Sequence, residues 1–277
     1  MIIGAQKSGT TSLAHQLSAL PEVNFCSVKE PGFFNSTANW SDELSRYHSL
    51  FSVPAGRLSG EGSTMHTFLP QYPQTAERIH AYNPQMKLMY IMRDPVERAI
   101  SHFAHRTGHG RTRDAIGDVL FRNPIYIDRS RYAVQLRPYL ELFPREQILL
   151  LIFEEYISNQ RQALEQVSGF LGISKPAGPD WEDGLHGNPS VGEYRWGDSA
   201  QKIRRSGMGR AVRRVLPASL RRMMRTSLGH RLESKPALNY DQKLLLWRFL
   251  EDDVAAVESL LGRRLDIWRA NYSTRAV

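Results

Sequence analysis

The sequence contains very little cysteine, since Cys26 is the only one among 277 residues. A single cysteine cannot form an intramolecular disulfide, and without a second cysteine it is a poor basis for a zinc site. We therefore expect no disulfide framework and no metal. This cysteine usage fits a reducing compartment, so we expect a cytoplasmic protein.

Long apolar runs are missing as well. No stretch approaches the roughly 18 to 20 apolar residues that span a bilayer, and the N-terminus lacks the charged start and apolar stretch of a signal peptide. We expect a soluble, unprocessed chain with no transmembrane segment. Internal repeats, low-complexity tracts and a convincing interdomain linker are also lacking, so the length and the 41% hydrophobic content predict one domain over residues 1–277.

Acidic residues are fewer than basic ones, 28 against 36, which gives a net charge of +8. This excess favours an anionic partner without deciding between a nucleotide, a sulfated glycan and nucleic acid. Many arginines fall between Lys202 and Arg231, but no aromatic residues are interleaved with them. No helix-turn-helix or RRM signature appears either. We expect a solvated helical face here and no nucleic-acid partner.

Short apolar runs alternate with helical patterns along the chain. Residues 1–3 have the pattern of the end of a strand whose start lies upstream, and a glycine-rich turn follows them. The predicted strands are 1–3, 87–92 and 147–153, and the predicted helices are 10–20, 95–105, 157–171 and 241–261. Residues 175–195 are rich in Pro, Gly and Asn and are expected to form a loop. The alternation predicts an α/β, P-loop-like, three-layer fold with a central parallel sheet flanked by helices and a helical C-terminal part.

The turn after the first strand has the composition of a phosphate-binding loop, Gly-Ala-Gln-Lys-Ser-Gly-Thr-Thr-Ser. Small residues between a strand and a helix let backbone N–H groups converge on an anion, and the helix N-terminus adds partial positive charge. Lys7 adds a full charge. The predicted contacts to the anion are Lys7, Ser8, Gly9, Thr10, Thr11 and Ser12. An ordinary glycine turn with a threonine cap is the alternative.

The position of the lysine separates this loop from that of nucleotide hydrolases and kinases. Their pattern, G-x-x-x-x-G-K-[ST], places the lysine directly after the second glycine, whereas Lys7 precedes Gly9 here and Thr10 occupies the lysine's place. No predicted strand ends in a lone aspartate for Mg²⁺, unless Asp94 takes that role. A P-loop nucleotide kinase or NTPase is therefore the alternative function and is disfavoured.

Four ordered segments together resemble the PAPS-dependent sulfotransferases, where PAPS is 3′-phosphoadenosine 5′-phosphosulfate. They are GAQKSGTTSL at 4–13, KEPGFF at 29–34, GEGST at 60–64 and YIMRDPVERAIS at 90–101, with weaker similarity at 132–143 and 265–268. The resemblance is to the branch that contains the heparan sulfate sulfotransferases and their bacterial relatives. It implies PAPS as sulfuryl donor, adenosine 3′,5′-bisphosphate (PAP) as product, no metal, and a hydroxyl-bearing acceptor such as a glycan.

The resemblance also implies roles for individual residues. Arg93 and Ser101 correspond to the arginine and serine that hold the 3′-phosphate in this family. Glu30 corresponds to the catalytic base of the heparan-type enzymes, and Lys7 would stabilise the leaving phosphate oxygen. Two alternatives remain open: Arg93 pairs only with a nearby carboxylate, or Glu30 forms a salt bridge with a neighbouring lysine. We expect Arg98 to be a structural salt-bridge partner.

Two positions depart from the family pattern. Gly32 stands where many bacterial relatives have histidine, and Gly62 stands where heparan-type enzymes often have lysine. If that histidine contributes to catalysis, another one must replace it, and the candidates are His66, His102 and His105.

Contacts to the acceptor are assigned to His66 and Tyr132, although core packing explains Tyr132 equally well. The basic segment 202–210 is a candidate clamp over the nucleotide. Because acceptor specificity lies in variable loops, the sequence leaves the identity of the acceptor open, as it does the oligomeric state.

Overall fold

The computed structural model describes residues 1–52, 58–108, 115–174, 194–196, 229–231 and 236–273. Its centre is a parallel sheet in which β1 (Ile2–Gly4) pairs with β4 (Leu88–Met92), and β4 pairs with β5 (Ile148–Ile152). All three predicted strands are therefore confirmed, shifted by one residue at most at their ends.

A second, two-stranded sheet lies on the other side of β1. It consists of β2 (Val23–Phe25) and β3 (Leu58–Gly60), which run parallel. Immediately after β3, the Ile2 amide donates to the carbonyl of Glu61 at 2.8 Å, and the Ser63 amide donates to the carbonyl of Ile2 at 3.0 Å. A bridge between Ile2 and Gly62 completes the link. Residues 61–63 therefore lie directly beside the strand that leads into the glycine-rich turn.

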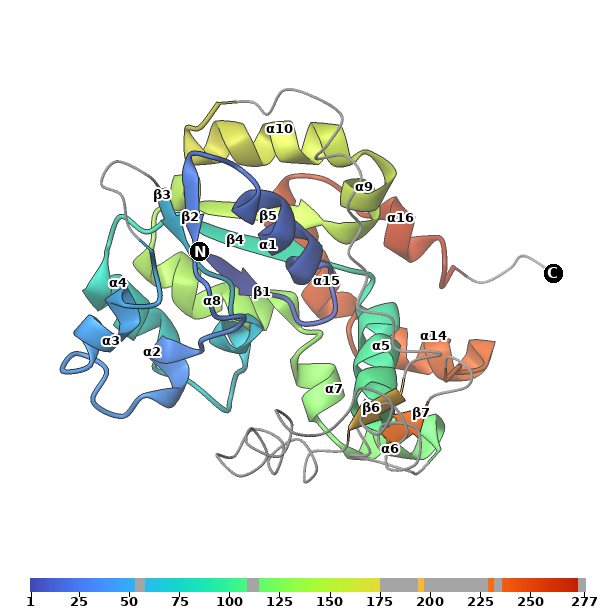
Figure 1. Cartoon of the computed structure of the whole chain (residues 1–277). Helices are drawn as coiled ribbons and strands as arrows, with labels where there is room; N and C mark the ends of the chain where they lie inside the picture. Colours follow the sequence, from blue (N-terminus) through green and yellow to red (C-terminus); the bar gives the residue numbers. More distant parts are fainter. Residues whose placement is uncertain (53–57, 109–114, 175–193, 197–228, 232–235, 274–277) are drawn as a thin grey trace.

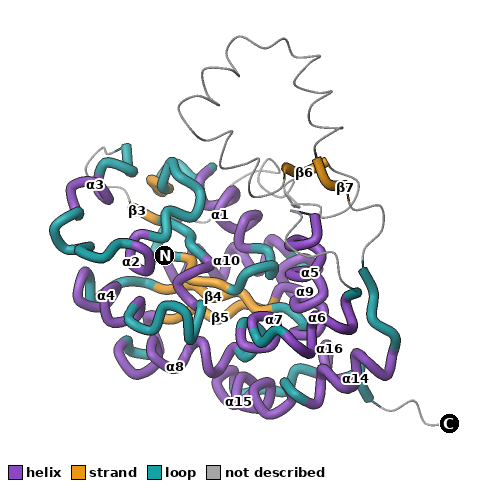
Figure 2. The backbone as a smooth tube through the Cα atoms, turned by 90° about the horizontal axis from the view of Figure 1, so that it is seen from below, coloured by secondary structure: helices purple, strands orange, loops and turns teal. Residues whose placement is uncertain are grey.

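Both faces of the sheet are covered, because neighbouring residues of β4 belong to different cores. Leu88, Tyr90 and Met92 belong to one core together with residues of α5 (Pro95–Gly108), α8 (Tyr132–Leu142) and α15 (Glu251–Leu261). Met89 and Ile91 belong to the other core, together with residues of α1 (Thr10–Ser18) and α10 (Gln160–Leu171). Figures 1 and 2 show the helices on both sides of the strands. The three-layer α/β architecture is confirmed.

The remaining elements are mostly short helices around this framework. They are α2 (Phe33–Ser36), α3 (Leu44–His48), η1 (Thr64–Thr67), α4 (Thr75–Tyr82), α6 (Ile116–Arg122), α7 (Ile125–Asp128), η2 (Arg145–Gln147), α9 (Phe153–Ser158), α14 (Tyr240–Arg248) and α16 (Asp266–Arg269). One antiparallel pair, β6 (Tyr194–Trp196) with β7 (Gly229–Arg231), is also described. None of the described helices is long and apolar enough to cross a membrane.

Two helices predicted as continuous are each divided. The helix predicted at 157–171 is divided at Asn159, whose side chain accepts a hydrogen bond from the Gln162 amide at 3.1 Å and so caps α10. The helix predicted at 241–261 is divided between α14 and α15, and α15 begins with three acidic residues, 251–253. Acidic side chains are favourable in the first turn of a helix because of the helix dipole. Apolar periodicity alone did not reveal either division.

The structure describes only a few residues of the segment before α14. The prediction of a loop at 175–195 is wrong for Tyr194 and Arg195, which belong to β6. The other residues of that predicted loop lie outside the described part of the chain. The basic segment at 202–231, including the candidate clamp at 202–210, also lies outside it except for β7.

Candidate active site

The glycine-rich turn connects β1 to α1, as the sequence predicts. Lys7 and Gly9 both adopt the left-handed conformation, with φ of 73° and 94°. A Cβ at Gly9 would lie 2.8 Å from Cδ2 of Phe153, so this position requires glycine on two grounds. No side chain caps the N-terminus of α1, so the N–H groups of its first turn are not used by a cap. The turn thus has the features of an anion-binding loop.

Four hydroxyl side chains of this turn differ in their environment. Ser8 is fully buried, and its Oγ has no hydrogen-bond partner within the described structure. Leaving a buried polar group unsatisfied costs about 1–3 kcal/mol, so this hydroxyl fits a bound anion. Thr10 and Thr11 are half-buried and line a cavity of about 360 Å³ together with Glu30. Ser12, by contrast, is buried and hydrogen-bonds with Tyr156 in the core.

Arg93 follows the last residue of β4, which is the parallel neighbour of β1. The carboxyl ends of parallel strands meet at one edge of a sheet, so Arg93 and the turn after β1 lie at the same edge. The Arg93 guanidinium lies 5.1 Å from the ring centroid of Phe153, and Nη2 is 3.8 Å from Oε2 of Glu97. Its Nε is buried with no partner in the described part of the chain. The contact to Glu97 is therefore long, and it leaves Arg93 with unused donor capacity.

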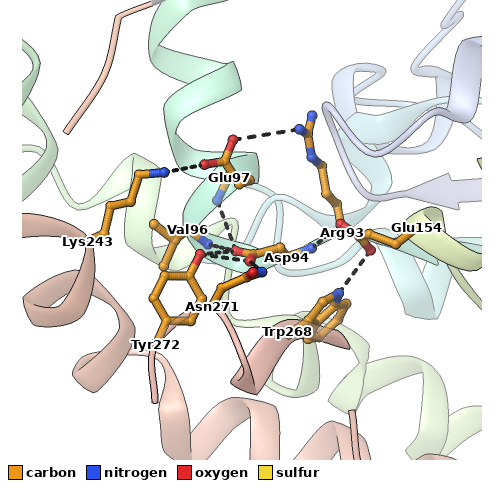
Figure 3. Close-up of polar contacts among 9 residues, drawn as sticks. All are labelled: Arg93, Asp94, Val96, Glu97, Glu154, Lys243, Trp268, Asn271 and Tyr272. Atoms are coloured by element: carbon orange, nitrogen blue, oxygen red, sulfur yellow. Dashed lines mark hydrogen bonds and ion pairs between the residues drawn. The ribbon is translucent and has the colours of Figure 1, made fainter. Parts of the chain in front are cut away.

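Asp94, the next residue, is held in a buried network (Figure 3). One carboxylate oxygen accepts from the amides of Val96 and Glu97 at 3.0 and 3.1 Å, so Asp94 caps the N-terminus of α5. Tyr272 donates to the carboxylate at 2.7 Å, and Asn271 donates at 3.1 Å. Burial raises the pKa of Asp94, and these hydrogen bonds partly offset that rise. Asp94 is therefore a structural anchor between α5 and the C-terminal segment.

Glu154 makes a second connection to the same segment (Figure 3). One of its oxygens accepts from the Asp94 amide at 3.0 Å, and the other accepts from the indole N–H of Trp268 at 2.9 Å. Trp268 belongs to α16 and is fully buried. Residues 265–268 show only weak similarity to the family pattern, yet through Glu154 this segment supports the strand end that carries Arg93.

Ser101 and Lys243 lie on the helices next to Arg93. Ser101 is half-buried in the second turn of α5. Lys243, from α14, donates to Glu97 at 2.8 Å (Figure 3). Sequence patterns did not single out Lys243, because it is one lysine on an amphipathic helix.

Glu30 lies in a sharp turn before α2. It adopts the left-handed conformation with φ of 51°, and Gly32 does the same with φ of 59°. The hydroxyl of Thr64, in η1, donates to Oε2 of Glu30 at 3.0 Å. Because Glu30 lines the same cavity as Thr10 and Thr11, the structure brings it to the N-terminal turn of α1.

The two residues predicted to contact the acceptor are buried. The His66 side chain has no exposed surface, and its Nε2 lies 2.8 Å from Oε1 of Glu61. Tyr132 is also fully buried, and its hydroxyl donates to the Arg93 carbonyl at 2.7 Å. Neither side chain has surface for an acceptor to touch, so this prediction does not fit the structure. Tyr132 instead supports the backbone of Arg93.

Two further predictions are corrected by burial. Arg98 is fully buried but forms hydrogen bonds with neutral groups, at 2.7 Å to the hydroxyl of Ser130 and at 2.6 Å to the carbonyl of Tyr126, instead of the expected salt bridge. His102 is also buried, and burial together with nearby arginines, Arg98 first, holds its pKa well below the usual range. This histidine is therefore not placed to replace the one missing at Gly32. His105 is half-buried on α5.

Arg129 is a residue of the site that the sequence analysis missed. One of its terminal nitrogens donates to the side-chain carbonyl of Gln6, in the turn after β1, at 3.0 Å. The other donates to Gln71 at 3.2 Å. The guanidinium also stacks on Phe68, 3.4 Å from the ring centroid. Nothing in the sequence distinguished this arginine from the others.

Among the described residues, no group of three or more His, Cys, Asp or Glu side chains is arranged so that it could hold a metal ion.

The known proteins that this chain resembles are sulfotransferases. A family model described as "Sulfotransferase domain" matches residues 1–181. Mouse heparan sulfate glucosamine 3-O-sulfotransferase 3A1 is 31% identical over 187 residues, covering 63% of this chain and 46% of that protein. Rat carbohydrate sulfotransferase 15 is 26% identical over 242 residues, covering 62% of this chain and 43% of that protein. The chain thus spans less than half the length of these two curated relatives.

One solved structure matches almost the whole chain. It is a sulfotransferase from Alicyclobacillus acidocaldarius, which is 26% identical, with a TM-score of 0.67 and coverage of 97% of both chains. The similarity therefore extends over the C-terminal helices as well as the region that the family model matches.

Proposed function

The chain belongs to the sulfotransferase family. From that premise we propose that it transfers a sulfuryl group from PAPS to an acceptor hydroxyl, and that this hydroxyl belongs to a carbohydrate. The observation that carries this proposal is the shared sheet edge at which the turn after β1 lies beside Arg93. Two anion sites at one edge suit a nucleotide with phosphates at both its 3′ and 5′ positions.

The proposed nucleotide contacts follow from the two anion sites. Lys7, Ser8, Gly9, Thr10 and Thr11 hold the 5′ end at the N-terminus of α1. Arg93 and Ser101 hold the 3′-phosphate, as the corresponding arginine and serine do in the family that the sequence resembles. The unpartnered Ser8 hydroxyl and Arg93 Nε support this assignment, because the 5′-phosphate would satisfy the hydroxyl and the 3′-phosphate would satisfy Nε.

The chemistry requires a group that accepts a proton and a group that stabilises charge. PAPS supplies an activated sulfuryl group, whose bond to the phosphate oxygen breaks as a bond to the acceptor oxygen forms. Lys7 stabilises the negative charge on the leaving phosphate oxygen. Glu30 takes the proton from the acceptor hydroxyl, a contribution typically worth about 10²–10⁴ in rate.

A carbohydrate hydroxyl is the acceptor that we propose. The relatives named above act on heparan sulfate glucosamine or, by name, on carbohydrate. The cavity beside Glu30 is lined by hydroxyl, apolar and basic side chains, including Thr11, Val28 and Lys29. Such a mixture suits a sugar, which presents both hydroxyl groups and apolar C–H faces.

The direct test is sulfuryl transfer from ³⁵S-labelled PAPS to a panel of acceptors. The panel contains an N-sulfated heparan oligosaccharide, a chondroitin oligosaccharide and a simple aryl glycoside, with mass spectrometry of any labelled product. Labelled product that requires the protein is the expected result. If no acceptor is labelled and no sulfate is released to water, while PAP does not bind, the proposal fails.

A nucleotide kinase or NTPase, the alternative from the sequence, is not favoured. Asp94 is the aspartate that would have to hold Mg²⁺, and its carboxylate is engaged by Tyr272, Asn271 and two backbone amides of α5. The position of Lys7 before Gly9 also differs from the pattern of those enzymes.

A further inference from the structure

The turn that carries Glu30 is tied to the segment after β3. Glu30 and Gly32 are both left-handed, so the backbone reverses sharply around Pro31. The amide of Gly32 donates to the hydroxyl of Ser63 at 3.0 Å in a buried contact. A left-handed glutamate is unusual and persists only where surrounding contacts hold it. The contact with Ser63 is one such restraint.

The Glu30 carboxylate receives a second, separate restraint. Thr64 is 3% exposed, and its hydroxyl lies 3.0 Å from Oε2 of Glu30. The hydroxyl donates and the carboxylate accepts, so one oxygen of Glu30 is engaged. The other oxygen, Oε1, keeps its capacity to accept a proton.

The segment that contains Thr64 is fixed by buried contacts of its neighbours. The Ser63 hydroxyl donates to Oε2 of Glu61 at 2.8 Å, and the other oxygen of Glu61 lies 2.8 Å from Nε2 of His66. The hydroxyl of Tyr139 donates to the His66 carbonyl at 2.7 Å. All four side chains are buried, so these contacts are shielded from competing water.

The same segment is joined to the sheet. Residues 61–63 pair with Ile2 on β1, two residues before the turn that contains the anion site begins. Thr67, in η1 with Thr64, donates to the carbonyl of Ile3 at 2.9 Å. The donor to Glu30 and the anion-binding turn are therefore fixed to one strand, and this fixes the carboxylate relative to the anion site.

We infer that Thr64 is a positioning residue for Glu30, an inference that rests on the proposed function. Its hydrogen bond to Oε2 selects the carboxylate orientation in which Oε1 takes the proton from the acceptor hydroxyl. Ser63, Glu61 and His66 hold Thr64 and the Gly32 amide in place. This arrangement assigns the orientation of the base to Thr64, in a chain that has Gly32 where many bacterial relatives have histidine.

The test compares Thr64→Val, which has the same shape without the hydroxyl, with Thr64→Ser, which retains it. Turnover is measured with ³⁵S-PAPS and the fastest acceptor of the panel above, or by sulfate release to water if no acceptor is faster. Because misplacement of a catalytic group by about 1 Å can cost about 10²-fold, we expect kcat to fall about 10- to 100-fold in Thr64→Val. We expect the Kd for PAP and the KM for the acceptor to change less than about threefold, and Thr64→Ser to restore most of kcat.

The matched control is Thr75→Val. Thr75 is equally buried, and its hydroxyl donates to the Tyr72 carbonyl at 3.1 Å at the start of α4. This variant loses a comparable buried hydroxyl away from Glu30, so its kcat should stay within about twofold of the wild type. Thermal unfolding of all three variants separates a loss of fold from a loss of orientation.

A double-mutant cycle decides whether Thr64 acts through Glu30. In a Glu30→Ala background, Thr64→Val should change the residual rate less than about twofold, because the group that it positions is gone. The inference is overturned if Thr64→Val alone retains kcat, or if its full effect persists without Glu30. A wild-type protein that neither binds PAP, labels an acceptor nor releases sulfate would instead refute the proposed function itself, so the two failures are distinguishable.

Discussion

The hydroxyl of Tyr272 lies 2.8 and 2.7 Å from the two carboxylate oxygens of Asp94, although 178 residues separate the two in the chain. Tyr272 thereby connects the C-terminal segment to the residue that follows Arg93.

Replacing Tyr272 with Phe should destabilise the fold in a pH-dependent way. Burial raises the pKa of Asp94, and the Tyr272 hydrogen bond lowers it again in part, so the variant should have a higher pKa there than the wild type. A carboxyl whose pKa in the folded state lies above its unfolded value of 3.8 makes a contribution to the free energy of unfolding that is lost as pH rises through the folded-state pKa. We expect a loss of about 1–3 kcal/mol at pH 7 and a smaller loss near pH 4.

Urea denaturation of Tyr272→Phe and wild type at both pH values measures this difference. Tyr240→Phe is the control, because the Tyr240 hydroxyl is exposed and donates to a carbonyl at 3.2 Å. Equal losses at pH 4 and pH 7 would mean that Tyr272 does not act through the charge on Asp94.

Replacing Arg93 with Ala should weaken PAP binding. A hydrogen bond to a charged group contributes about 1.5–3 kcal/mol, and about 1.4 kcal/mol corresponds to a tenfold change in Kd, so we expect Kd to rise about 10- to 100-fold. Isothermal titration calorimetry measures it directly. Arg161→Ala, on an exposed helix surface, should leave Kd unchanged; an unchanged Kd in Arg93→Ala would remove the 3′-phosphate assignment.

Replacing Glu30 with Gln should separate binding from turnover. The amide keeps the size of the side chain but cannot take a proton from the acceptor, so kcat should fall by about 10²-fold or more. The Kd for PAP should stay within about threefold, because Glu30 is not among the proposed nucleotide contacts. Single-turnover kinetics with labelled PAPS measures the rate, and full activity in this variant would rule out Glu30 as the base.

Replacing Arg129 with Ala should loosen the anion-binding turn. Gln6 would lose the donor at 3.0 Å that holds its side chain, and Phe68 would lose the stacked guanidinium. Each interaction is worth about 1 kcal/mol, so we expect PAP binding to weaken about 5- to 30-fold. Arg129→Lys should not restore it, because an ammonium lacks the planar fork that reaches Gln6 and Gln71 together. Calorimetry of both variants tests this, and wild-type binding in Arg129→Ala would contradict it.

The sequence predicted the parts of the fold that local pattern determines. The apolar run at 87–92 lies between two cores, so its strand could be recognised without any partner. The division at Asn159 could not, because apolar residues continue at helical spacing on both sides of it. Only the capping geometry of the asparagine side chain ends one helix and begins the next.

For the candidate site, too, the sequence predicted the local features but not the contacts between distant residues. Glycine and lysine spacing located the turn between β1 and α1, because those residues act through local backbone geometry. The contacts that hold Glu30, Arg93 and the neighbouring Asp94 come from Thr64, Tyr132, Glu154 and Tyr272, which are distant in the chain and ordinary in type. Tertiary packing brings them together, and no periodicity in the sequence reports it. His66 was misassigned for this reason, since its burial against Glu61 depends on the fold of η1.

The contacts of Trp268, Asn271 and Tyr272 limit how far this chain can be truncated. The family model ends at residue 181, yet these three residues satisfy the carboxylates of Asp94 and Glu154, and Trp268 and Tyr272 also belong to the core shared with β4. A fragment that stops at the boundary of the family model would leave two acidic side chains and an apolar sheet face open to water. The shortest fragment expected to retain the proposed nucleotide site therefore runs at least to Tyr272.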